Sequence, residues 1–254
     1  MAEYETVRRA GATAHTAAID VGLRAHMNKV YGLMSVAMLL TGLVAFVVGT
    51  DLASARLGQD TMFLSPGILE TMFSSPVRYI IMFAPLAVVF AFSAGINRMS
   101  ESTARMVFFT FAGLMGLSIS WIFAVYTSMS IATTFFVTAI AFAGLSLWGY
   151  TTKKDISGWG SFLIMGVIGL IVASVVNIWL QSGAIQFAIS GIGVLIFAGL
   201  TAYDTQKIKT TYIQMAADGQ TEWLGKAAIM GALSLYLDFI NMFMFLLQFL
   251  GNRN

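Results

Sequence analysis

Long apolar runs separated by short polar stretches are the dominant pattern of this chain. A helix needs about 20 consecutive apolar residues to cross the hydrocarbon core of a bilayer. Seven segments reach this length, and most of the connections between them are short; the longest, residues 50–76, is predicted to be irregular or partly interfacial. We therefore predict seven transmembrane helices, at residues 29–49, 77–97, 106–126, 131–149, 159–180, 184–203 and 227–250.

Composition supports this interpretation, since 58% of the 254 residues are hydrophobic and only 10% are charged. Soluble domains carry about 25% charged residues. The chain is therefore predicted to be an all-α integral membrane protein surrounded by the lipid bilayer. Its net charge of +2 is spread over scattered Lys and Arg, which argues against nucleic acid as a partner. Because the first residues are polar, we divide the chain into an N-terminal arm, residues 1–27, and a seven-span membrane domain, residues 28–254.

The distribution of basic residues predicts how the chain is oriented. Loops that carry an excess of Lys and Arg stay in the cytoplasm. Eleven of the fourteen Lys and Arg fall on the side of the N-terminus, and the three others are Arg56, Arg78 and Arg253. We therefore expect the N-terminal arm to be cytoplasmic and the C-terminus to lie outside.

Three ionisable residues stand out because they belong to the predicted spans. Asp238 lies within the last span, in SLYLDFINMFMF, with no Lys or Arg within ten residues on either side. A charged carboxylate at the centre of a span costs roughly 2.5–3.5 kcal/mol, and such residues usually mark ion or proton pathways. Asp204 closes the sixth span and Arg98 closes the second.

Asp204 and Asp238 lie on consecutive antiparallel spans and can therefore meet inside a helical bundle. A carboxyl pair that holds one proton costs far less in hydrocarbon than two anions, and such a pair titrates as a unit. Arg98 could then make a bidentate contact with whichever aspartate is ionised. Alternatively, Asp204 is an ordinary interfacial residue beside Lys207, and the Arg98 side chain merely extends to the interface. Counting residues sets Asp204 nearer the membrane edge than Asp238, so direct contact needs a tilt, a helix break or an early start of the last helix.

Three stretches identify a resemblance to a known family: YDTQKI at residues 203–208, LYLDFINMFMFLLQFLG at residues 235–251 and YTTKKDIS at residues 150–157. Together they resemble the Bax inhibitor-1 family of multi-pass membrane proteins. The resemblance implies seven helices with the last one central and wrapped by the other six. For bacterial members, located in the inner membrane, it implies a pH-sensitive calcium leak governed by two aspartates, which match Asp204 and Asp238. A latching arginine of the family is matched by Arg98.

Calcium is expected here as a permeant ion, with no resident cofactor. It prefers six to eight oxygen ligands. Asp204 and Asp238, with Tyr236, Asn241 and nearby backbone carbonyls, provide fewer than a tight site needs, which suits transient binding in a leak. Deprotonation could strengthen the Arg98 contact and close the path, or charge the pair and attract cations; the first is the direction we favour.

Two other classes of function are compatible with parts of the sequence. Paired intramembrane aspartates also occur in aspartyl proteases, whose dyad shares a proton to activate water. Those enzymes carry Gly-x-Gly before the second aspartate and a later Pro-Ala-Leu motif, and this chain has neither, so we expect no enzymatic activity. The N-terminal arm could instead dock a membrane-anchored AAA protease, which would make the protein a non-transporting modulator or a stress-response regulator.

Overall fold

The computed structural model describes residues 2–219 and 223–253, with side chains from residue 19 onward. All named elements in this part of the chain are helices, and the one isolated pairing of extended backbone joins Tyr126 and Arg253. Seven helices of the described residues are long and apolar enough to cross a membrane, which confirms the predicted number. They are α1 (Ala2–Arg56), α3 (Val77–Gly95), α4 (Glu101–Ile119), α5 (Ser128–Thr151), α6 (Trp159–Leu180), α7 (Gly183–Ala217) and α8 (Leu224–Leu250). A short helix, α2 (Pro66–Phe73), and two 3₁₀ turns, η1 (Ile96–Arg98) and η2 (Ser120–Ala124), complete the structure.

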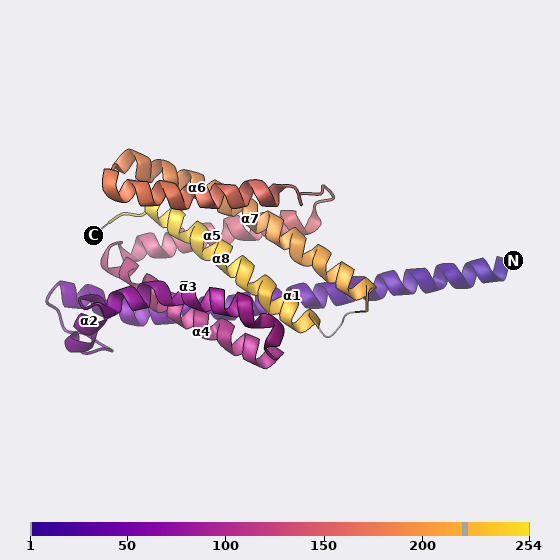
Figure 1. Ribbon diagram of the computed structural model, residues 1–254, viewed down its shortest axis with the longest axis horizontal. Helices are drawn as coiled ribbons and strands as arrows, with labels where there is room; N and C mark the ends of the chain where they lie inside the picture. The colour runs from indigo at the N-terminus through magenta and orange to yellow at the C-terminus, as the bar shows by residue number, and fades with distance from the viewer. Residues whose placement is uncertain (1, 220–222, 254) are drawn as a thin grey trace.

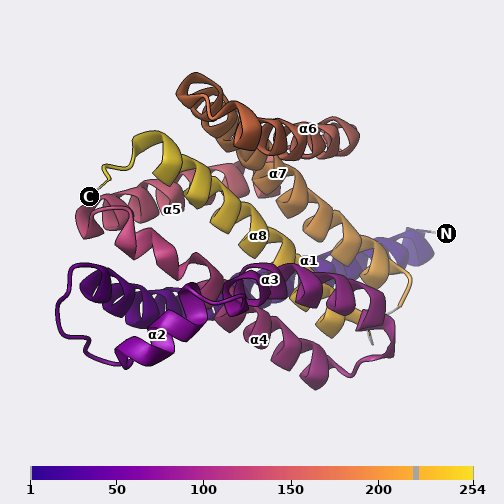
Figure 2. The same cartoon turned by 60° about the vertical axis from the view of Figure 1, so that its left-hand side comes forward.

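Helix α8 is the centre of the bundle, as predicted. It packs directly against α7, α1, α5 and α4, whereas α6 packs mainly on α7 and α3 mainly on α4. In the most apolar 18-residue stretch of α8, 61% of the residues are buried, whereas in the corresponding stretch of α6 only 11% are buried. Figures 1 and 2 show α8 running obliquely between the side formed by α6 and α7 and the side formed by α3 and α4. The direct wrapping is thus provided largely by four helices, with α3 and α6 forming an outer layer.

The predicted bounds are accurate for α6 and too short for α1 and α7. Helix α7 continues to Ala217, fourteen residues past the predicted end, and Ile208 and Tyr212 in this extension are buried. Helix α1 covers the predicted arm and the first span without interruption, and Leu23 and Met27 already belong to the core. Hydropathy detects contact with lipid, whereas these extensions are helical segments that pack against protein.

Several helices begin at a hydroxyl side chain that caps the first turn. Ser100, Thr127 and Ser182 accept hydrogen bonds from the backbone N–H groups of Thr103, Ser130 and Ile185 at the starts of α4, α5 and α7, at 3.1, 3.2 and 3.4 Å. Each contact satisfies one of the backbone donors that a helix leaves unpaired at its N-terminus. The predicted third span, residues 106–126, is not one helix, because α4 gives way to η2 after Ile119.

The long connection after α1 is organised by a single buried carboxylate. Asp51 is 2% exposed, and its two oxygens accept hydrogen bonds from the backbone N–H groups of Met62, Phe63 and Leu64 at 2.8, 2.7 and 2.6 Å. Hydrogen bonds from backbone N–H groups to a carboxylate are among the stronger ones in proteins. Asp51 therefore holds the predicted hairpin in place; residues 57–65 of this connection are irregular, and α2 follows them.

Candidate functional site

Asp238 lies in the middle of α8 and is only 4% exposed. Its Oδ2 atom is the one buried side-chain oxygen or nitrogen, among the described residues, that has no hydrogen-bond partner. Most buried polar groups in proteins are hydrogen-bonded, and each exception calls for an explanation. An unpartnered carboxyl on the most buried helix is therefore the first candidate for a functional group in this bundle.

The packing of α7 against α8 brings Asp204 close to Asp238. Ile208 packs on the bare backbone of Gly231, and Phe245 packs on Gly193, which defines the antiparallel register of the two helices. In this register Asp238 is level with Thr201, three residues or about 4.5 Å along α7 from Asp204. Since packed helices are about 8–10 Å apart, this offset leaves the two carboxyls close enough for the charge of one to affect the other.

The extension of α7 accounts for this proximity. Asp204 does not terminate its helix but is followed by more than three further helical turns, and its side chain is half-buried. Helix α8 begins at Leu224, slightly before the predicted start, while the predicted N-cap Thr221 lies outside the described residues. The difference in depth inferred from the sequence is therefore reduced to about one helical turn.

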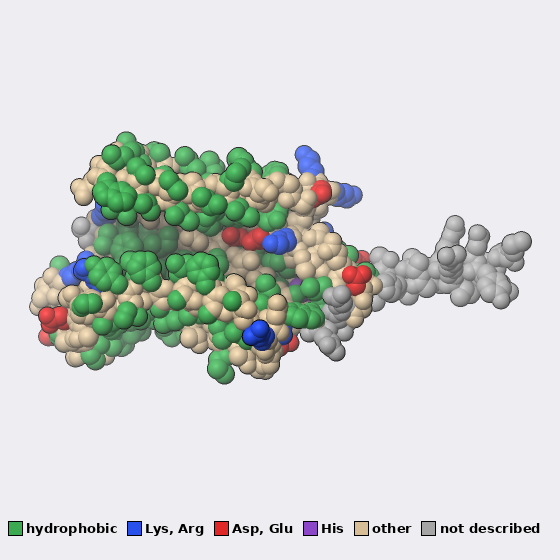
Figure 3. All heavy atoms as spheres, viewed as in Figure 1, with side chains coloured by type: hydrophobic (Ala, Val, Ile, Leu, Met, Phe, Trp, Pro, Cys, Tyr) green, Lys and Arg blue, Asp and Glu red, His purple; other side chains and the backbone are tan. Residues whose placement is uncertain are grey.

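Lys207 follows Asp204 by three residues and therefore lies on the same side of α7, about one turn further along. Its Nζ atom also lies over the Tyr203 ring, 5.9 Å from the ring centroid. Figure 3 shows acidic and basic side chains together in a hollow between the outer helices of the two sides of the bundle. An ionised Asp204 therefore has a positive charge about one turn away on its own helix.

Arg98 is not brought to the aspartate pair in this structure. It is exposed at the end of η1, and no ion pair joins it to either carboxyl among the described residues. Glu101, three residues further on, packs against Gly225, which is thirteen residues or about 20 Å along α8 from Asp238. A direct contact between Arg98 and the pair therefore requires movement of α3 relative to α7 and α8.

Tyr236 and Asn241, the two predicted secondary residues, have different surroundings. Tyr236 is fully buried and exchanges a 2.6 Å hydrogen bond with Thr41 of α1, while its ring packs edge-on against Phe111 of α4. Tyr236 therefore faces away from Asp204. Asn241 follows Asp238 by three residues and so shares its face of α8, and its Nδ2 donates to the Leu237 carbonyl at 2.8 Å.

A line of hydroxyl groups next to the pair was missed by reasoning from the sequence. The Tyr31 hydroxyl of α1 is 2.6 Å from Ser146 Oγ of α5, and Ser146 Oγ is 2.8 Å from Thr205 Oγ1 of α7. Thr205 in turn donates to the carbonyl of Thr201 at 2.7 Å. Ser and Thr residues are common in membrane helices, where they often bond to the preceding turn, so the sequence carries no signal that separates these from the rest.

A second polar cluster joins the opposite end of α7 to α8 and α6. Gln186 Nε2 donates to Gln248 Oε1 at 2.7 Å, and Asn177 Nδ2 donates to Gln186 Oε1 at 3.2 Å. Ser190 Oγ donates to the Gln186 carbonyl at 2.8 Å and lies 3.5 Å from Gln248 Oε1. We call these four residues the amide cluster. None of them is charged, which is why the search for charges within spans did not find them.

The acidic residues do not form a resident metal site in the part of the chain that is described. No group of three or more His, Cys, Asp or Glu gathers there. Asp155, in the loop between α5 and α6, is fully solvated, and hydrogen bonds from Ser157 lower the pKa of its carboxyl below the usual value of about 3.9. Asp155 is therefore ionised throughout pH 5–8 and provides an internal comparison for the buried pair.

Comparison with known proteins agrees with this architecture. The model of the family described as "Inhibitor of apoptosis-promoting Bax1" matches residues 23–254. The inner membrane protein YbhL of Escherichia coli K12 is 45% identical over 233 residues, covering 91% of this chain and 93% of YbhL. An uncharacterized protein of Rickettsia prowazekii is 44% identical over 95% of both chains, and a membrane protein of Streptococcus pyogenes is 33% identical over 92% of this chain and 96% of its own length. This chain therefore belongs to the Bax inhibitor-1 family and is an integral multi-pass protein of the bacterial inner membrane.

Proposed function

We propose that this protein is a cation leak with calcium as permeant ion, gated by protonation of Asp204 and Asp238. The observation that carries the proposal is the buried Asp238 carboxyl, which has an oxygen without a partner and lies within electrostatic reach of Asp204. A group so placed is tolerated as a neutral acid or as an anion with a nearby counter-charge. A cation passing along the contact between α7 and α8 would supply such a counter-charge.

Protonation changes what the pair can bind. With one proton shared, the pair carries a single negative charge, which attracts a cation but is too weak to hold calcium in a closed set of six to eight oxygens. Release at the next step is a requirement of conduction. When the pair loses its proton, Asp204 can instead attract Arg98, provided that α3 moves toward α7. We expect this contact to close the path, so the leak should fall as the pH rises.

The test is a calcium flux assay with purified protein in liposomes that contain a calcium-sensitive dye, across pH 5–8. The Asp204→Asn and Asp238→Asn variants should each lose the pH response, because a side-chain amide does not change its charge between pH 5 and pH 8. Asp155→Asn is the matched control: it removes a carboxyl that is solvated and ionised over the whole range. This control should behave like the wild-type protein.

The outcomes separate the parts of the proposal. If Asp204→Asn and Asp238→Asn both keep the wild-type pH response, the aspartate pair is not the gate. If wild-type protein gives no more flux than empty liposomes at any pH, the leak itself is wrong. If Asp155→Asn also loses the response, the effect is not specific to the buried pair.

A further inference from the structure

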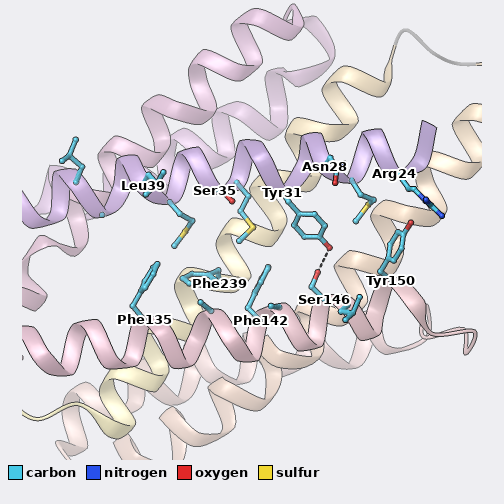
Figure 4. A pocket seen from close by; sticks show the side chains of 18 of the residues that line it. Arg24, Asn28, Tyr31, Ser35, Leu39, Phe135, Phe142, Ser146, Tyr150 and Phe239 are labelled. Atoms are coloured by element: carbon cyan, nitrogen blue, oxygen red, sulfur yellow. Dashed lines mark hydrogen bonds between the residues drawn. The ribbon is translucent and has the colours of Figure 1, made fainter. Parts of the chain in front are cut away.

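A deep groove separates α1 from α5, with Phe239 of α8 on its floor. Its volume is about 1260 Å³, larger than the 300–1,000 Å³ typical of small-molecule pockets. Figure 4 shows side chains from both helices pointing into it along its length. We call it the α1–α5 groove. It contains neither Asp204 nor Asp238, although Ser146 in its lining is hydrogen-bonded to Thr205, the residue after Asp204.

The α1–α5 groove is polar at one end and apolar along the rest. Figure 4 shows Arg24 of α1 and Tyr150 of α5 pointing toward one another at the polar end, near the hydrogen bond between Tyr31 and Ser146. The remainder is lined chiefly by Met, Leu and Phe side chains, among them Leu39, Leu43, Phe46, Phe135 and Phe142. Three of these, Leu39, Leu43 and Phe46, are more than half exposed, so the apolar part is open to whatever surrounds the bundle.

The length of the α1–α5 groove matches one leaflet of a bilayer. Its lining on α5 runs from Phe135 to Tyr150, fifteen residues or about 22 Å of helix. One leaflet with its headgroups is about 20–22 Å thick. The lining of the groove is almost wholly apolar below the polar end, and Leu39 and Leu43 are exposed there, as in a surface that contacts an acyl chain. The length and the apolar lining therefore favour an acyl chain as the occupant.

The charge at the polar end favours an anionic headgroup. Arg24 is exposed there, and Lys209 of α7 lies behind Tyr150, donating to its backbone carbonyl at 2.8 Å. No carboxylate is among the residues that line the groove; the acidic residue nearest in sequence is Asp20, one turn before Arg24 on α1. Basic residues near the membrane surface attract anionic lipids.

We infer that the α1–α5 groove binds one anionic phospholipid, with an acyl chain along the Phe and Met side chains and the phosphate at Arg24 and the Tyr150 hydroxyl. The polar end of the groove defines the leaflet, which is the one on the side where α1 begins. The bound lipid would fill the space between α1 and α5 and so complete the wall around α8.

Native mass spectrometry of the full-length protein, released from detergent micelles, tests the inference. Phosphatidylglycerol and phosphatidylethanolamine of identical acyl chains serve as the anionic and zwitterionic probes. We expect one phosphatidylglycerol per protomer to survive collisional removal of detergent. Phosphatidylethanolamine should bind about fivefold more weakly, given about 1 kcal/mol for one basic residue at the surface.

Two glycines of α1 provide a matched pair of variants for the apolar part. Gly42 lines the groove and Gly32 does not, while both are exposed, and a Cβ atom added to either would meet no neighbouring atom within 4 Å. Gly42→Phe should fill the groove and abolish the tightly bound lipid. Gly32→Phe, with the same added volume on the same helix, should retain it.

Two arginines of α1 provide a second pair, independent of any packing change. Arg24→Gln should weaken phosphatidylglycerol about fivefold, to the level of phosphatidylethanolamine. Arg56→Gln, at the other end of α1 and also exposed, should leave the preference unchanged.

Three results would overturn the inference. The first is wild-type lipid binding in Gly42→Phe. The second is an equal loss of bound lipid in Gly42→Phe and Gly32→Phe, which would indicate nonspecific annular lipid. The third is a wild-type dimer that the Gly42→Phe substitution dissociates, which would indicate that a second copy of the chain occupies the groove. If Gly42→Phe does not fold, Arg24→Gln decides: an unchanged preference for phosphatidylglycerol refutes the anionic site.

Discussion

The contact between α7 and α8 contains two polar clusters of opposite character. In the amide cluster, Gln186 is hydrogen-bonded to both Gln248 and Asn177, so its amide donates and accepts within the protein. In the aspartate pair, Asp238 is more deeply buried and yet has an oxygen with no partner. The two clusters lie in the same pair of helices, at different levels along it.

The difference separates a structural role from a functional one. A polar cluster whose members are hydrogen-bonded to one another fixes the register of the helices that contribute to it. An unpartnered buried carboxyl costs free energy, which is recovered when a proton or a cation arrives. The amide cluster is therefore suited to fixing α7 against α8, and the aspartate pair to the sensing role proposed above; the following predictions test this division.

The largest expected difference is in the pH response of the calcium leak. Gln248→Leu should keep this response, whereas Asp238→Asn should lose it. The protonated fraction of one carboxyl changes by at most about tenfold per pH unit. The calcium leak should therefore change by no more than about tenfold per pH unit. Flux measurements at pH 5 and pH 8 on both variants provide the check. A flat response in Gln248→Leu would mean that the two clusters are coupled and that the division is wrong.

The next largest effect is on stability, where a substitution in the amide cluster should matter more than one in the aspartate pair. Gln186→Leu should destabilise the protein by about 1.5 kcal/mol, because Asn177 loses its acceptor and Gln248 loses its donor. The corresponding fall in Tm is about 3–6 °C. Thermal unfolding in detergent, followed by circular dichroism, measures it. Gln214→Leu, on the exposed face of the same helix, is the control; equal Tm values for the two variants would contradict the structural role.

Removing the unpartnered carboxyl should have a smaller effect of the opposite sign. Asp238→Leu is expected to raise stability by about 1 kcal/mol, since an apolar side chain of similar size avoids the cost of burying an unsatisfied group. The expected rise in Tm is about 2–4 °C, measured in the same experiment. A fall in Tm of comparable size would indicate that Asp238 has a stabilising partner, which would place the two clusters in the same class.

The smallest effect is expected for the latch. Arg98→Ala should raise the leak at pH 8, where the contact with Asp204 is expected to close the path, by up to about fivefold, the value of an exposed ion pair, and should leave the leak at pH 5 unchanged. Arg56→Ala is the control for removing a basic residue at the membrane surface. A leak at pH 8 in Arg98→Ala equal to that of the control would remove Arg98 from the gate and leave Lys207 as the basic residue one turn from Asp204.

The sequence predicted the architecture well because contact with lipid has a strong signature. Apolar length predicted the seven helices, and the family resemblance implied the central position of the last one, which the structure confirms for α8. Hydropathy could not predict the continuation of α7 beyond Asp204, where Ile208 and Tyr212 are buried by protein rather than by lipid. Because this continuation was not predicted, the sequence overestimated the difference in membrane depth between the two aspartates.

Other features escaped prediction because they depend on contacts between distant residues. No prediction from the sequence concerned Asp51, and only the structure reveals that it accepts three hydrogen bonds from residues eleven to thirteen positions away. The amide cluster joins Gln186 to Gln248 across 62 positions. The α1–α5 groove depends on the spacing of two helices, which no local pattern determines.

The extension of α7 also makes this helix a lever. From Asp204 to Ala217 it is a continuous rod of thirteen residues, about 20 Å long. A tilt of about 5° at Asp204 would move the far end by about 2 Å. We hypothesise that a rearrangement at Asp204 and Asp238 displaces the end of α7 outside the hydrocarbon core. Distances between spin labels at Gln214 and Arg56 should then differ between pH 5 and pH 8, and identical distances would refute the lever.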